Sequence, residues 1–105
     1  MLSDGLSSRE IEQVRECLRA AVEGPFFPDW EFHTLMGVER AEVDAVWKAW
    51  PDVTTDPISF RCAVLGSLNN LSGYPHRKEA VLREYLSFDA SHIPQLMARL
   101  KEVGI

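Results

Sequence analysis

The sequence lacks most of the patterns that mark an enzyme or a metal protein. Its 105 residues include two cysteines and three histidines, and none of these forms the closely spaced pair that a metal site requires. It has no glycine-rich phosphate loop, and its serines lack the strand-to-helix turn that carries the nucleophile of many hydrolases. We therefore predict a protein that is not an enzyme and has no catalytic residue, no metal and no cofactor.

Long apolar runs are also missing. No stretch approaches the roughly 18 apolar residues that a membrane-spanning helix needs. Residues 1–8 lack the basic and then apolar order of a secretory signal. We therefore expect a cytoplasmic protein with no membrane segment, in which Cys17 and Cys62 are buried as free thiols.

What the sequence does contain is helical periodicity around one apolar segment. Residues 57–72 carry a single charge, Arg61, and apolar side chains fall on both sides of the helix that this segment would form. Asp56 and Pro57 are typical of a helix start, and Gly73 is typical of a helix end. The composition, with 46% hydrophobic and 26% charged residues, is that of an ordinary globular protein. We predict an all-α fold in which residues 1–105 form a single compact domain of five or six helices around a central buried helix at 57–72.

The remaining helices follow from capping residues and breakers. We predict helices at about 8–23, 30–36, 39–50 and 77–87, and a last helix that begins at Asp89 or Ser91. For residues 86–88, helix and strand both remain open. A strip of small and polar residues along the central helix, including Gly66, would either allow another backbone to approach closely or meet solvent. Near its end, Asn69 and Asn70 are expected to hold the following loop in place.

The charge is concentrated in one part of the chain. The net charge is −5, yet residues 23–56 alone sum to −6, with eight acids against Arg40 and Lys48. Six of the ten aromatic residues lie between Phe26 and Trp50, within the same segment. These aromatics can fill the core, or one or two of them, Trp30 or Phe27 first, can stay exposed within an acidic rim as anchors for a partner. The second alternative predicts a partner-binding surface that is made of Phe27, Trp30, Glu31, Glu39, Glu42 and Asp44.

Residues 32–46 resemble the helix-turn-helix unit of bacterial DNA-binding proteins. A first helix ends at Gly37, Val38 follows, and Val43 and Val46 lie where the second helix would pack back on the first. The resemblance implies that DNA would meet the residues that open the second helix, which are Glu39, Arg40, Glu42 and Asp44. Three of these four are acidic and would repel phosphate. We therefore do not expect nucleic acid as the partner.

In general character, without a shared motif, the small acidic chain resembles bacterial immunity proteins, which neutralise toxins. The resemblance implies a non-catalytic protein-binding module, immunity- or antitoxin-like, whose acidic and aromatic segment at 26–50 covers a basic protein partner such as a toxin. One alternative is a transcriptional regulator that binds DNA through the helix-turn-helix. A second is a small structural or ligand-carrying subunit that uses the apolar surface near Tyr74 and His76. Formation of a homo-oligomer remains open.

Overall fold

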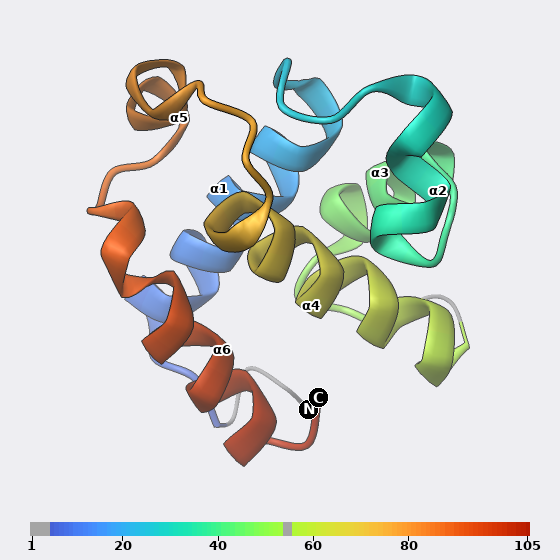
Figure 1. Cartoon of the computed structure of the whole chain (residues 1–105). Coiled ribbons are helices and arrows are strands. Elements are labelled where there is room, and N and C mark those ends of the chain that lie inside the picture. Colours follow the sequence, from blue (N-terminus) through green and yellow to red (C-terminus); the bar gives the residue numbers. More distant parts are fainter. Residues whose placement is uncertain (1–4, 54–55) are drawn as a thin grey trace.

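The computed structural model describes residues 5–53 and 56–105 (Figure 1). Within these ranges the chain forms six α-helices and a short 3-10 helix and contains no strand. This confirms the predicted all-α class. The elements in chain order are α1 (Ser8–Glu23), α2 (Asp29–Met36), α3 (Arg40–Ala49), α4 (Pro57–Gly73), α5 (Glu79–Tyr85), η2 (Ala90–His92) and α6 (Ile93–Glu102).

Helix α4 lies at the centre of the fold, as predicted. Neighbouring residues determine where it begins. An Asp56 carboxylate oxygen accepts a 2.9 Å hydrogen bond from the Ser59 amide, and Pro57 occupies the first turn. Helices α1, α2, α3 and α6 all pack against it (Figure 1). Its buried apolar side chains lie on one broad side: Phe60, Ala63, Val64, Leu68 and Leu71. The opposite side is not covered as the sequence suggested, because Ile58 is 76% exposed and Leu65 is only half-buried.

The helices share one hydrophobic core. Its fully buried members include Leu18 of α1, Leu68 of α4, and Ile93 and Leu100 of α6. The Cα radius of gyration is 12.5 Å, close to the value of about 13 Å typical of a compact domain of 100 residues. No helix within the described residues has the combined length and apolarity that are needed to cross a membrane.

The sequence predicted most helix ends correctly, but not those of α5. That helix covers Glu79–Tyr85 rather than residues 77–87. It begins late because Arg77 has a left-handed backbone, with φ of 58°, which no α-helix accepts. Residues 86–88 belong neither to a helix nor to a strand. A 3-10 turn, capped by Asp89, then leads into α6.

The end of α2 lies directly on the middle of α4. A Cβ atom placed on Gly66 would lie 3.2 Å from the Met36 carbonyl oxygen, so the small residue permits the close approach that the sequence suggested. Beside it, the Asn70 amide donates to the carbonyl oxygens of Leu35 and Gly66, at 2.9 and 2.8 Å. Asn70 is therefore structural, but its side chain secures the end of α2 and not the loop after α4, contrary to our expectation.

Candidate functional site

Trp30 is the most exposed large apolar side chain among the described residues. It retains 81% of its accessible surface, whereas Trp50 retains 2%. Trp30 lies in the first turn of α2, directly after Pro28 ends the connector from α1. That turn faces outward because the opposite side of α2, with Phe32 and Met36, is buried in the core.

Acidic side chains and a histidine lie near Trp30 in the chain. Asp29 precedes it, and His33 lies one helical turn further along the exposed side of α2. The His33 Nδ1 atom lies 2.6 Å from a Glu39 carboxylate oxygen, so the turn between α2 and α3 brings Glu39 to the same region. We call this region, formed by Asp29, Trp30, Glu31, His33 and Glu39, the Trp30 surface.

Several of these acids also hold the local structure. At the start of α3 the Glu42 carboxylate accepts a 3.4 Å hydrogen bond from the Glu39 amide, in the arrangement of a capping box. The Glu31 carboxylate accepts a 2.8 Å hydrogen bond from the Tyr74 hydroxyl, and this bond raises the pKa of Tyr74 above its usual value. The acidic character of the surface is therefore coupled to the folding of α2 and α3.

Three of the predicted partner-binding residues do not belong to this surface: Phe27, Glu42 and Asp44. Glu42 is exposed, but it lies in the first turn of α3, where it contributes to the helix cap. Phe27 is 4% exposed, and its ring packs edge to face against Phe32 and Tyr74, so the expectation that it stays available to a partner is wrong. It is buried because its ring lies between α2 and the segment after α4, where Phe32 and Tyr74 contact it. Asp44 is half-buried, and its carboxylate pairs at 2.8 Å with Lys48 one turn along α3.

Arg40 is the structural residue that sequence reasoning missed. The resemblance to a helix-turn-helix placed it among the exposed residues that would face DNA. Its guanidinium instead donates to the carbonyl oxygens of Ala21, Val22 and Phe27, at 3.0 to 3.2 Å, and to the Asp29 carboxylate at 2.9 Å. It also lies over the Phe32 ring, 4.3 Å from the ring centroid. Arg40 thereby caps the end of α1. The feature of the sequence that could have indicated this structural role is that Arg40 is one of only two bases in the acidic segment.

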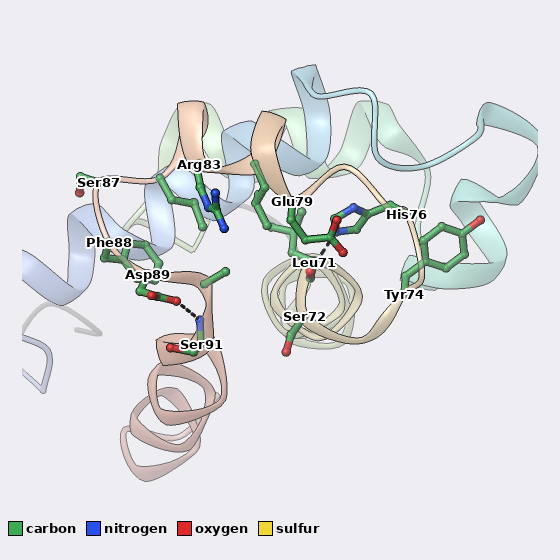
Figure 2. A pocket seen from close by; sticks show the side chains of 13 residues that line it. Leu71, Ser72, Tyr74, His76, Glu79, Arg83, Ser87, Phe88, Asp89 and Ser91 are labelled. Carbon is green, nitrogen blue, oxygen red and sulfur yellow. Dashed lines mark hydrogen bonds between the residues drawn. The ribbon is translucent and has the colours of Figure 1, made fainter.

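A second candidate site is a cleft on another part of the molecule (Figure 2). Its volume is about 650 Å³, and it lies between the end of α4, helix α5 and the chain that leads to α6. It forms because α5 packs chiefly on α1 and stands away from α4 and α6 (Figure 1). Tyr74 and His76, around which the sequence suggested an apolar binding surface, both line it.

The cleft combines an apolar floor with polar walls. The floor is formed by Leu71, Leu82, Leu86 and Phe88. Glu79 and Arg83 point into the cleft from α5, and Asp89 and Ser91 face them from the opposite side (Figure 2). His76 closes one end, with Nε2 3.2 Å from the Leu71 carbonyl oxygen and Nδ1 accepting from the Lys78 amide at 3.0 Å. These two bonds require the neutral imidazole that carries its proton on Nε2.

Neither site has the composition of a metal centre. Among residues 5–53 and 56–105, no three His, Cys, Asp or Glu side chains come together as ligands would. The two thiols also lie apart from both sites. Cys17 is fully buried in α1, where burial raises its pKa, but the prediction that Cys62 is also buried is wrong, because it is only half-buried in α4. Comparison of the chain with protein-family models, with curated proteins and with solved structures found no match.

Proposed function

We propose that this protein is a non-catalytic protein-binding module that covers a basic partner protein with the Trp30 surface. The observation that carries the proposal is the 81% exposure of Trp30, which lies in the acidic segment at 23–56. Burying an apolar side chain of this size is worth roughly 2–3 kcal/mol. Exposed tryptophans with a polar rim are typical of the residues that dominate protein interfaces.

Charge indicates the kind of partner. The segment at 23–56 carries a net charge of −6, and its two bases are both engaged in ion pairs, Arg40 with Asp29 and Lys48 with Asp44. The acids that remain attract a positively charged surface and accelerate its association at low salt. In its most specific form, the proposal is an immunity- or antitoxin-like protein that neutralises a basic toxin.

The position of Arg40 argues against the alternative of DNA binding. With Arg40 turned toward the end of α1, the start of α3 offers Glu39, Ala41 and Glu42 to the outside. Two of these three side chains are acidic and would repel the phosphate backbone. A regulator of the helix-turn-helix type would therefore need its phosphate contacts from elsewhere in the chain.

Affinity capture tests the proposal. Wild type, Trp30→Ala and Ile58→Ala would each be used to capture proteins from a lysate of the source organism, with and without nuclease. Ile58 is the matched control because it is 76% exposed but lies in the first turn of α4. We expect wild type and Ile58→Ala to retain the same basic protein regardless of nuclease, and Trp30→Ala to lose it. Retention that survives in Trp30→Ala, or that depends on nucleic acid, would contradict the proposal.

The electrostatic component needs a variant that spares the α3 cap. Glu39→Gln with Glu42→Gln removes two charges while keeping side-chain oxygens that can accept the capping hydrogen bonds. We expect the association rate with the captured partner to fall severalfold at low salt, and the difference from wild type to shrink as salt is added. Glu12→Gln with Glu84→Gln is the control, since these exposed acids lie on α1 and α5. An equal fall in both double variants would show that only net charge matters.

A further inference from the structure

The cleft between α4, α5 and α6 has an arrangement of charges that selects a ligand class. Glu79 and Arg83 lie one turn apart on α5, in the order that normally favours an ion pair on a helix. The pairs Arg19–Glu23 and Asp44–Lys48 have the same spacing and do close, at 2.9 and 2.8 Å. Within the described part of the chain, no ion pair joins Glu79 to Arg83, and both side chains point into the cleft (Figure 2).

A base and an acid that form no ion pair with each other on one wall set a condition on any occupant. The Asp89 carboxylate across the cleft accepts a hydrogen bond from the Ser91 amide, which lowers its pKa, and it lies near enough to Arg83 for that charge to lower the pKa further. A ligand that enters the cleft displaces water from Glu79 and Arg83, and a charged group that loses water without gaining a partner is costly. An anionic ligand would satisfy Arg83 but leave Glu79 without a partner, and a cationic ligand would do the reverse. A ligand that carries both charges close together satisfies both residues.

The floor of the cleft supplies the rest of the specificity. Glu79, Leu82, Arg83 and Leu86 recur at positions i, i+3, i+4 and i+7, so Leu82 lies on the same face of α5 as the two charges. Leu71 of α4 and the half-buried Phe88 continue the apolar floor. A volume of about 650 Å³ is within the range of small-molecule sites.

We propose that this cleft binds a free α-amino acid with a large apolar side chain. The ammonium group would meet the Glu79 carboxylate, the carboxylate would meet the Arg83 guanidinium, and the side chain would lie against the half-buried Phe88, since Leu71 and Leu82 are each only 2% exposed. The adjacent positions of the two charged groups in an α-amino acid match the one-turn spacing of their partners on α5. This proposal concerns the cleft alone and does not depend on the protein-binding role of Trp30.

A titration followed by two-dimensional NMR of the labelled protein tests the proposal with four probes. L-Phenylalanine has both charges and an apolar side chain. N-acetyl-L-phenylalanine lacks the positive charge, L-phenylalaninamide lacks the negative charge, and glycine lacks the side chain. We expect phenylalanine to shift the amide signals of Ser72, Leu82 and Ser91, and to bind about tenfold or more tighter than each of the other three.

Two variants and two controls locate the contacts. Glu79→Gln and Arg83→Gln should each weaken phenylalanine binding about tenfold or more and abolish its advantage over the analogue that lacks the corresponding charge. Glu84→Gln on α5 and Arg61→Gln on α4 change exposed charges outside the cleft and should leave binding unchanged. The wild-type pattern of amide signals shows that each variant is folded.

Three results would overturn the proposal. The first is the absence of shifts at the cleft up to the solubility of phenylalanine. The second is equal binding of phenylalanine and either blocked analogue, which would indicate a site for a peptide terminus. The third is unchanged affinity in Glu79→Gln and Arg83→Gln.

Discussion

Arg40 shows how a single side chain can join segments that are distant in sequence. It lies at the start of α3, yet it satisfies carbonyl oxygens at the end of α1 and in the connector before α2. Carbonyl groups at the end of a helix have no partner within the helix, so a guanidinium with several donors is well suited to them. The same residue faces Asp29, which adjoins Trp30, so it also supports the proposed binding surface.

We expect Arg40→Met to lower the free energy of unfolding by roughly 2–4 kcal/mol, because several carbonyl oxygens would lose a charged donor. Arg40→Lys should fall between wild type and methionine, since one ammonium cannot reach all of these acceptors. Urea denaturation measures both values. Arg61→Met, at an exposed position of α4, is the control and should change stability by less than about 0.5 kcal/mol. A loss in Arg40→Met no larger than in the control would refute the capping role.

At the scale of elements, the contact between α2 and α4 depends on a glycine, Gly66, which has no side chain to keep the two helices apart. Gly66 lies inside α4, where glycine normally costs roughly 1 kcal/mol relative to alanine. Here the glycine allows the Met36 backbone to lie against the helix, and Asn70 then bonds to the Leu35 carbonyl oxygen. The cost in helix propensity is offset by tertiary packing.

Gly66→Ala and Gly73→Ala form a matched pair of substitutions in α4. The new Cβ at position 66 would lie 3.2 Å from the Met36 carbonyl oxygen and 3.3 Å from its Cα, whereas nothing lies within 4 Å of a Cβ at position 73. We expect Gly73→Ala to raise the thermal midpoint slightly and Gly66→Ala to lower it, because α2 must shift. Thermal unfolding followed by circular dichroism measures both. Equal stabilisation by the two substitutions would show that the contact between α2 and α4 has room for a Cβ atom at position 66 and does not require glycine.

At the scale of the whole molecule, α1 and α6 are joined through one ion pair. The Arg99 guanidinium donates to the Glu10 carboxylate at 2.9 Å and to the Gly5 carbonyl oxygen at 2.8 Å, so it links residues that are 89 and 94 positions apart in the chain. The hydrogen bond from Arg99 lowers the pKa of Glu10, and a bond with the Ser7 backbone lowers it further.

The lowered pKa of Glu10 predicts how stability changes with pH. Folding favours the ionised carboxylate, so this contribution is present above the usual glutamate pKa and is lost as the pH falls through the lowered value. We expect Glu10→Gln to lower the thermal midpoint by a few degrees at pH 7 and to differ little from wild type in strong acid. Calorimetry across this pH range measures the difference. A difference that is independent of pH would mean that the carboxylate charge contributes nothing.

Much of the fold could be predicted because it depends on neighbours in sequence. The start of α1 at Ser8, the capping of α4 by Asp56 and the αL turn at Gly37 all result from side chains or dihedral angles within a few residues. The exception is α5, whose start depends on the left-handed conformation of Arg77, and no residue-type preference signals that conformation.

The sequence by itself determined the all-α class, the central helix and the concentration of acids and aromatics at 23–56, because periodicity, capping and composition are local properties. The tertiary structure decided which of those aromatics is exposed: it buried Phe27 against Phe32 and Tyr74 and left Trp30 exposed. It also directed Arg40 to α1 and opened the cleft beside α5. Each of these outcomes depends on contacts between segments far apart in the chain, and side-chain types and their spacing do not specify such contacts.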